Sequence, residues 1–281
     1  MPELPEVEAT RRYVEEHALD RTIERVVVHD RRILASLTPA RLKRALIGSR
    51  MSAARRHGKH LFVATDRGPW LHLHLGMSGD LYVRAPNEPL QSALGDDSPP
   101  RFARLTLGFA GGTELVFDDA RLFGRVGLVE SPDADIRRRR LGIDALDGSF
   151  RPRLFRSSLE ARRGSIKALL MNQGVVAGLG NLYVDEVLYQ SSIHPRARVD
   201  RLTVSEIDLM VKNIRRVLTT AIARIEKRRE HPRRNLILRR SEDQTCGMCG
   251  GEIRRATIAG RTTYFCARHQ KSRSDLARAR R

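Results

Sequence analysis

The sequence lacks several features that would assign it to other classes of protein. Its 281 residues contain no signal-peptide core and no apolar run near the roughly 18 residues of a membrane-spanning helix. Three cysteines, all near one end, do not make a disulfide framework. We find no internal repeat. We therefore expect a soluble cytoplasmic protein without a membrane partner, long enough to form two domains.

Acidic residues are scarce relative to basic ones. The chain has 52 Lys and Arg against 33 Asp and Glu, a net charge of +19. Residues 201–281 hold 21 Lys and Arg against 8 Asp and Glu, so this stretch carries +13 of that excess. Such a charge favours a polyanionic partner, with nucleic acid the first candidate and an anionic membrane the second.

The first half of the chain has the pattern of an antiparallel β-sandwich. Short apolar or alternating runs, punctuated by Gly, Pro and Asp, are typical of its strands. These runs predict strands at residues 23–28, 61–64, 70–75, 81–83, 104–107 and 114–117. Flanking helices are predicted at residues 5–17 and 39–46, and the Pro-, Ser- and Asp-rich tract 85–100 is predicted to be a surface loop.

The second half of the chain changes to a helical period. Residues 158–171, 182–191 and 205–227 are predicted to be helices, the last with Thr203 as its N-cap. Gly, Ser and Pro cluster at residues 148–152, which predicts a domain boundary there. We expect an α+β multidomain protein with a β-sandwich over residues 1–150 and a helical domain over residues 151–240.

The remaining residues contain a metal-binding pattern. Cys246-x2-Cys249 and Cys266-x2-His269 are separated by sixteen residues. Two knuckles at this spacing place four ligands tetrahedrally around one structural Zn²⁺, whereas free buried thiols need no such register. We therefore predict a zinc finger over residues 241–271, followed by a basic tail over residues 272–281.

The first six residues, MPELPE, carry reactive groups at a chemically special position. Initiator methionine is normally removed before proline, which leaves Pro2 with a secondary amine. An α-amino group has a reference pKa of about 8, so part of it is unprotonated at neutral pH and can form a Schiff base. Glu3 and Glu6 supply carboxylates nearby. From composition alone, a solvated terminus explains the pattern equally well.

The string MPELPEVEATRR resembles the start of the formamidopyrimidine-DNA glycosylase and endonuclease VIII family, closer to the formamidopyrimidine branch. The resemblance implies that Pro2 attacks the sugar C1′ of a damaged nucleotide. It implies that Glu3 is the acid/base that opens the sugar, and that Glu6 supports the site by hydrogen bonding. The implied activity is that of a bifunctional glycosylase and AP lyase, which excises oxidised bases and nicks by β,δ-elimination.

Two further segments of the first half resemble parts of this family. Residues 56–60 (RHGKH) are similar to a hairpin whose lysine contacts DNA at the lesion and assists elimination, which implies this role for Lys59. Residues 74–79 (HLGMSG) are similar to a loop whose methionine, here Met77, fills the space left by an extruded base.

Residues 119–124 (DARLFG) are similar to the loop that completes this machinery. The resemblance implies that Arg121 contacts the orphaned base and that Phe123 is a wedge. A damaged base cannot react inside the stack, so such an enzyme must flip it out and occupy the void. Ordinary core packing explains Met77 or Phe123 taken alone. It does not explain why all three segments, at residues 56–60, 74–79 and 119–124, match the family in order.

Residues 178–186 (GLGNLYVDE) are similar to the family's helix–two-turns–helix element. A glycine-flanked turn that opens a helix exposes backbone N–H groups to a phosphate, and Asn181 adds a side-chain donor. The resemblance implies that Lys167 and Arg162 join Asn181 on the DNA strand backbone.

Residues 260–266 (GRTTYFC) are similar to the family's terminal β-hairpin, whose arginine holds phosphates beside the lesion. This resemblance implies that role for Arg261. Relatives with this finger usually have a fourth cysteine, and His269 stands at its place here.

The chain departs from the formamidopyrimidine branch at two places. Phe102-Ala103-Arg104 replaces a usual His-x-His pair, and Arg104 is the candidate to compensate as a DNA contact. Residues 226–245 lack the Gly-Gly-Thr-Thr segment that caps an everted oxidised purine. The preferred lesion therefore stays open among 8-oxoguanine, formamidopyrimidines and oxidised pyrimidines.

The resemblance thus implies a monomeric, nucleoid-associated enzyme that acts on damaged double-stranded DNA. The alternative is a catalytically silent zinc-containing DNA-binding protein on the same scaffold. Pro2, Glu3, Glu6 and Lys59 together argue against a pure binder. A basic ribosome- or membrane-associated protein accounts for the charge but not for the N-terminus.

Overall fold

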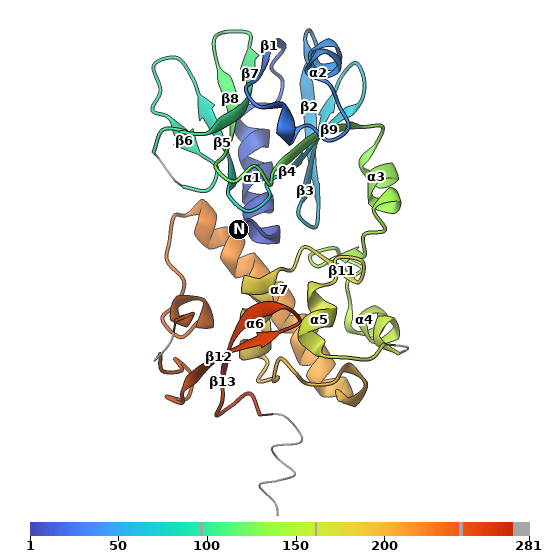
Figure 1. Cartoon of the computed structure of the whole chain (residues 1–281), viewed down its shortest axis with the longest axis vertical. Helices are drawn as coiled ribbons and strands as arrows, with labels where there is room; N and C mark the ends of the chain where they lie inside the picture. Colours follow the sequence, from blue (N-terminus) through green and yellow to red (C-terminus); the bar gives the residue numbers. More distant parts are fainter. Residues whose placement is uncertain (96–97, 161, 242–243, 272–281) are drawn as a thin grey trace, which may run out of the picture. The chain divides into compact units, whose positions relative to one another are not determined.

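The computed structural model describes residues 1–95, 98–160, 162–241 and 244–271 (Figure 1). The chain divides into two compact units. Unit 1 comprises Met1–Arg140 with Ile225–Arg228, and unit 2 comprises Leu141–Arg224 with Arg229–Arg281. The Gly-, Ser- and Pro-rich residues 148–152 therefore belong to unit 2, and the basic tail predicted at residues 272–281 lies outside the described residues.

Unit 1 is built on two antiparallel sheets. The five-stranded sheet has the order β1 (Ile23–Val28), β7 (Ala103–Phe109), β8 (Glu114–Asp119), β5 (Gly79–Arg84) and β6 (Gln91–Ser92). The four-stranded sheet has the order β2 (Met51–His57), β3 (His60–Thr65), β4 (Trp70–His74) and β9 (Arg125–Val129). Leu107 and Phe117 from the first sheet share one buried core with Leu61 and Leu71 from the second, which confirms the predicted sandwich.

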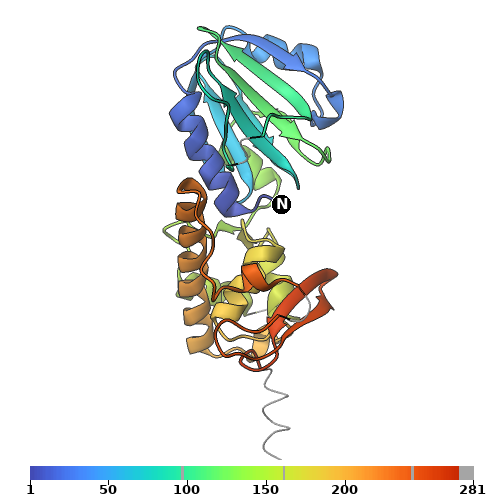
Figure 2. The same cartoon turned by 90° about the vertical axis from the view of Figure 1, so that its left-hand side faces the viewer.

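Three α-helices accompany these sheets. They are α1 (Leu4–His17), α2 (Pro39–Leu46) and α3 (Pro132–Arg138), and a short 3-10 turn, η1, spans Arg31–Ile33. Helix α1 contacts β2, β3 and β5 and runs alongside the strands (Figure 2). Its apolar side chains Leu4, Val7 and Val14 are buried. The helix that begins at Leu4 is therefore fixed by the sandwich core.

Unit 2 is mainly helical. Its elements are β10 (Ile143–Asp144), α4 (Pro152–Leu159), α5 (Ile166–Met171), β11 (Val176–Ala177), α6 (Asn181–Gln190), η2 (Val199–Arg201), α7 (Val204–Glu226, except its last two residues), η3 (Leu236–Arg239), β12 (Ile253–Ile258) and β13 (Arg261–Cys266). Thr203 caps α7 as predicted, because its hydroxyl accepts from Glu206 N while Glu206 Oε2 accepts from Thr203 N.

The single helix predicted over residues 158–171 is wrong. Helix α4 ends at Leu159, and α5 begins only after Ser165, whose hydroxyl accepts a hydrogen bond from Ala168 N. Gly164 lies between them with φ of +103°, a conformation that an α-helix cannot contain. No helix in the described part of the chain is both long and apolar enough to cross a membrane.

A buried carboxylate connects α1 to the sandwich. Glu8 Oε1 lies 2.9 Å from Arg11 and 3.0 Å from Arg12, and Glu8 Oε2 lies 2.9 Å from Arg56 of β2. Burial raises the pKa of Glu8, but hydrogen bonds and charges from Arg11 and Arg56 outweigh it and lower the pKa to about 2. Because this pKa lies below the ordinary value of 4.5, ionised Glu8 stabilises the folded state above that pH.

We predict that this stabilisation is lost as the pH falls from about 4.5 toward 2. Glu8→Gln should flatten the decline of the urea midpoint over that window, because the substituted side chain has no proton to gain. Glu16→Gln, at an exposed position of the same helix, is the control and should keep the wild-type slope. Equal slopes for Glu8→Gln and wild type would contradict the role of Glu8.

Candidate functional site

The N-terminal residues form a capped helix start. Glu3 and Glu6 make a reciprocal capping box, in which Glu3 N donates to Glu6 Oε2 at 2.8 Å. Pro2 is buried, and only 1% of Glu3 is exposed. Glu6 therefore holds the peptide that carries Pro2 and Glu3, and its supporting role in a reaction stays a prediction.

A cavity of about 540 Å³ opens beside Pro2. Its lining residues all belong to unit 1 and include Met77 and Ser78 from one loop, together with Phe102. The structure thus brings the terminal residue and the predicted void-filling loop to the same cavity.

Lys59 occupies a two-residue turn between β2 and β3. His57 and His60 are paired at its base, and Gly58 has φ of +57°, as the first central position of a type I′ or II′ turn requires. Burial lowers the pKa of His74 to about 4, with a further contribution from the charge of Lys59. His60, the residue after Lys59, pairs with His74 in the register of β3 and β4, so the Lys59 turn lies close to the end of β4, from which the Met77 loop starts.

Asp119 joins the two predicted DNA-contacting loops. This carboxylate has no exposed surface, and Oδ1 accepts from Ser78 Oγ at 2.5 Å while Oδ2 accepts from Gly124 N at 2.7 Å. Arg121 N also donates to Ser78 Oγ at 3.1 Å. Asp119 was not predicted to be functional, although it is the first residue of the DARLFG segment.

The two loops also touch through their backbones. Gly76 has φ of +66°, and a Cβ there would lie 2.4 Å from the carbonyl carbon of Phe123. Met77 and Phe123 are 37% and 49% exposed. The Arg121 guanidinium lies 5.2 Å from the Phe123 ring centroid. Unit 1 therefore presents two apolar side chains and an arginine on packed loops.

Arg104 supports this assembly from β7. Its Nε donates to the carbonyl of Asp119 at 2.8 Å, and its guanidinium lies 5.6 Å from the Phe102 ring centroid. Only 16% of its side chain is exposed. The structure thus gives Arg104 a loop-supporting contact that the sequence did not suggest, and its DNA contact stays a prediction.

The predicted DNA-contacting residues of unit 2 differ in their exposure. Arg162 is exposed after α4, where its Nε donates to Ser158 O at 2.8 Å. Asn181 begins α6, and its Nδ2 donates to Thr262 O at 2.9 Å. Arg261 is exposed at the start of β13, after a turn in which Ala259 and Gly260 both have positive φ.

The placement of Lys167 contradicts its predicted contact with the DNA backbone. Its side chain has no exposed surface, and Nζ lies 2.6 Å from Asp185 Oδ1 and 2.7 Å from Thr263 Oγ1. An ammonium group held in this way does not reach a phosphate at the surface. The sequence could not reveal this, because the lysine falls in a short helix with an irregular apolar pattern.

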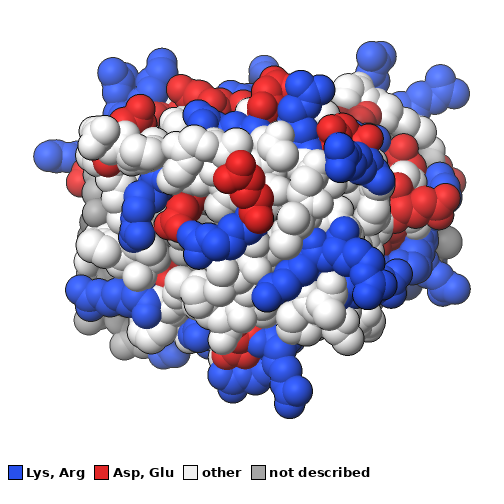
Figure 3. All heavy atoms as spheres, turned by 90° about the horizontal axis from the view of Figure 1, so that it is seen from above, with Lys and Arg blue, Asp and Glu red and all other residues white. Residues whose placement is uncertain are grey.

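The end of unit 1 at which α2 and β1 lie shows Lys and Arg interspersed with Asp and Glu (Figure 3). This face is therefore mixed in sign, although the whole chain is strongly basic. A polyanion gains most from a surface of one sign, so this face does not have the character of a nucleic-acid interface.

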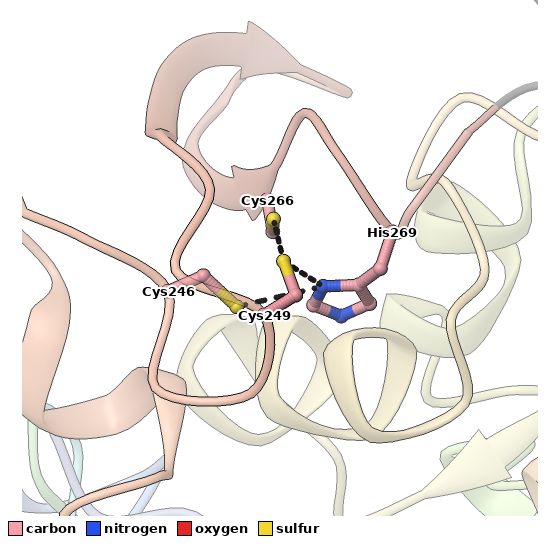
Figure 4. Close-up of side chains that lie close together, drawn as sticks. All are labelled: Cys246, Cys249, Cys266 and His269. Carbon is pink, nitrogen blue, oxygen red and sulfur yellow. Dashed lines mark hydrogen bonds between the residues drawn. The ribbon is translucent and has the colours of Figure 1, made fainter.

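The three cysteines and His269 converge at one point of unit 2 (Figure 4). Cys249 Sγ lies 3.5 Å from Cys266 Sγ and 3.5 Å from His269 Nδ1, and Cys246 Sγ also lies 3.5 Å from Nδ1. A tetrahedral ion with bonds of about 2.0–2.3 Å separates its ligands by about 3.5–3.8 Å. All four ligand atoms lie within 4.8 Å of one another, so the donor set and its convergence on one point fit a single metal ion.

The surroundings of His269 indicate which ring nitrogen binds. His269 Nε2 lies 3.1 Å from the carbonyl of Tyr189, to which a protonated Nε2 donates, and this leaves Nδ1 facing the sulfurs. The Tyr189 hydroxyl lies 3.0 Å from Cys246 Sγ. Residues around the ligands thus orient both an imidazole and a thiolate.

Comparisons with known proteins agree with this arrangement. Residues 1–126 match the model of the formamidopyrimidine-DNA glycosylase N-terminal domain, and residues 141–230 match that of the formamidopyrimidine-DNA glycosylase H2TH domain. The formamidopyrimidine-DNA glycosylase of Halorhodospira halophila is 34% identical, over 96% of this chain and all of that protein. The chain belongs to the formamidopyrimidine-DNA glycosylase family.

Other relatives and solved structures extend this result. The formamidopyrimidine-DNA glycosylase of Arabidopsis thaliana is 32% identical over 96% of this chain and 71% of that protein. The Lactococcus lactis enzyme, solved non-covalently bound to DNA containing an AP site, superposes with a TM-score of 0.81 at 29% identity. That alignment covers 96% of this chain and 99% of the Lactococcus chain. The structure of MutM in complex with DNA containing carbocyclic 8-oxo-G superposes with a TM-score of 0.83 at 29% identity. That alignment covers 96% of this chain and all of the MutM chain.

The contact between the two loops of unit 1 generates a prediction. Gly76→Ala should lower the free energy of unfolding by about 2–5 kcal/mol, because it combines left-handed strain with overlap onto Phe123. Gly111→Ala is a matched control, since Gly111 has φ of +84° but a Cβ there would meet no described atom within 4 Å. It should cost only the strain, about 1–2 kcal/mol. Urea unfolding measures the free energy of unfolding of both variants. Equal losses in Gly76→Ala and Gly111→Ala would show that the loops do not need this close approach.

Proposed function

We propose that the protein is a bifunctional DNA glycosylase and AP lyase of base-excision repair that acts on damaged double-stranded DNA. The observation that carries the proposal is the burial of Pro2 beside Glu3, next to a cavity shared with Met77. The names of the relatives and the DNA bound in the solved neighbours support it. The alternative, a catalytically silent binder, leaves this arrangement unexplained.

The chemistry would begin once Met1 is removed, because its peptide bond otherwise engages the Pro2 nitrogen. The unprotonated amine attacks the sugar C1′, the bond from C1′ to the base breaks, and the base leaves with a proton. Glu3 gives a proton to the ring oxygen, and the opened sugar remains on Pro2 as an iminium ion. The ionised Glu3 then takes a C2′ proton, the 3′ phosphate leaves as the C2′–C3′ double bond forms, and Lys59 assists this elimination.

The described loops would prepare the DNA for this reaction. Met77 and Phe123 are exposed apolar side chains of the type that fills or wedges a stack after a base is extruded. Arg121 would contact the orphaned partner base. In unit 2, Asn181 and Arg261 would hold phosphates. The lesion stays open between oxidised purines, formamidopyrimidines and oxidised pyrimidines, and a panel of single-lesion duplexes ranks them.

We predict that borohydride traps a covalent adduct between the protein and DNA containing an abasic site, because reduction makes the iminium bond permanent. Mass spectrometry should place the adduct on Pro2. A preparation that retains Met1 should give no adduct, because the Pro2 nitrogen is then part of a peptide bond. An adduct on Lys59 would overturn the assignment of Pro2, and absence of any adduct would favour the silent binder.

The Cys3His cluster is proposed to hold one structural Zn²⁺ through Cys246, Cys249, Cys266 and His269 Nδ1. Zinc would supply no step of the reaction and would fix the fold of the β12–β13 hairpin, because small fingers fold on their metal. The hairpin presents Arg261, so loss of the metal would reach DNA binding through the position of this arginine.

We predict one zinc per chain by metal analysis of the purified protein. His269→Cys should keep the zinc, because thiolate is an equally good ligand, whereas His269→Ala should lose zinc to a chelator faster and bind DNA more weakly. Met248→Ala lies between two ligands at an exposed position and is the control. Unchanged zinc retention in His269→Ala, or a zinc-free wild type, would rule out His269 as a ligand.

A further inference from the structure

Strand β13 is attached to the helices of unit 2 at three consecutive residues. Thr262 O accepts from Asn181 Nδ2 at 2.9 Å. Thr263 Oγ1 lies 2.7 Å from Lys167 Nζ, which donates to it, and Tyr264 N donates to Asp185 Oδ2 at 3.1 Å. Arg261 directly precedes these residues, so its backbone is positioned by them.

Asp185 is the centre of these contacts. It has no exposed side-chain surface and accepts from Lys167 Nζ at 2.6 Å, from Tyr264 N and from the Arg240 guanidinium. The guanidinium also lies 5.0 Å from the Tyr264 ring centroid. One buried carboxylate thus joins α6 to α5, to the segment after η3, and to β13.

A directed chain of hydrogen bonds leads from this centre to Arg261. Lys167 donates to both Asp185 and Thr263 Oγ1, and the Thr263 hydroxyl donates in turn to the carbonyl of Arg261 at 3.0 Å. Thr263 is fully buried, whereas Arg261 is exposed. The chain therefore connects the interior of unit 2 to the backbone of the arginine at its surface.

Stability alone is a weak explanation for such a pair. Removing a lysine and an aspartate from water costs several kcal/mol per ion, and apolar residues of similar volume often stabilise a core as well or better. Fixed hydrogen-bond geometry, in contrast, is something that apolar packing does not supply. The fixed geometry of these hydrogen bonds is suited to a segment, here β13, whose position must be specific.

We infer that Lys167 and Asp185 are positioning residues, which act on DNA through Arg261 and do not touch it. This inference rests on the proposed function only in taking Arg261 as a phosphate contact. Lys167 sets the position of β13 through Thr263, and Asp185 holds both Lys167 and the backbone of Tyr264. If the backbone of Arg261 is displaced, its contact with the phosphate is lost even though the arginine side chain is intact.

The test measures binding to a duplex with a tetrahydrofuran abasic analogue by fluorescence anisotropy over a series of salt concentrations. Arg261→Ala should weaken binding roughly tenfold and reduce the salt slope by about one unit, as expected for one phosphate contact. Lys167→Met should give the same two changes. It leaves Asp185 paired with Arg240, so no buried charge is left without a partner.

The double variant decides between positioning and an independent effect. If Lys167 acts through Arg261, Lys167→Met should weaken binding no further when Arg261→Ala is already present. Lys212→Met, at an exposed lysine on α7, is the control for the loss of one positive charge and should not share this non-additivity. Additive losses, or a Lys167→Met variant that binds with wild-type affinity and slope, would overturn the inference.

One further variant keeps the outcome clear. Thr263→Val breaks the same chain without changing charge and serves in place of Lys167→Met if that variant does not fold with its metal. It should also match Arg261→Ala in affinity and salt slope. If Arg261→Ala itself binds normally, the proposed role of Arg261 fails, and the inference fails with it. The Arg261→Ala variant alone shows this failure, whereas only the double variant shows a failure of the inference by additive losses.

Discussion

The chemistry proposed for this protein depends on a backbone nitrogen, and a backbone nitrogen can be aimed only by fixing the chain. Terminal residues are ordinarily poorly ordered unless something ties them down. Here α1 begins at Leu4, directly after the terminal residues, and the capping box of Glu3 and Glu6 fixes its first turn. Glu8 then anchors the same helix to Arg56 of β2, the strand that leads into the Lys59 turn. The proposed nucleophile and the proposed assisting lysine are thus positioned by one helix–strand contact.

The loops that would handle the DNA depend on strand pairing in the same way. Gly79 and Asp119 are partners in the register of β5 and β8, so the loop before β5 and the loop after β8 start from adjacent positions. Asp119 uses this adjacency to bind Ser78 and Gly124 together. Motif comparison proposes DNA contacts for Met77, Arg121 and Phe123, because these expected roles depend on residue type. The role of Asp119 is carried by a contact across 41 residues of sequence, which no local pattern contains.

The sequence predicted elements whose signals are local and missed those that depend on partners. Strand β1 and helix α2 have the predicted bounds, because alternation and a Thr38–Pro39 cap are visible in the chain itself. Strand β2 was not predicted, since its alanines and arginines have weak strand propensity and its pairing with β3 creates it. Lys167 was misassigned for a related reason. Its partners lie 18 and 96 residues away, and only the folded chain shows that a lysine is neutralised inside the protein.

The β12–β13 hairpin shows why several such partners are needed together. A two-stranded hairpin is marginally stable by itself in water, so it cannot hold an exposed arginine in place without support. Cys266 at one end of β13 belongs to the Cys3His cluster, and Asn181, Lys167 and Asp185 hold residues nearer its other end. A metal held by the Cys3His cluster would therefore fix where the strand ends, while the buried ion pair would fix how Arg261 leaves it. Because these supports act at different points of β13, losing either one would leave part of the strand without support. The sequence motif around the cysteines indicates only the Cys3His cluster and gives no sign of the buried ion pair.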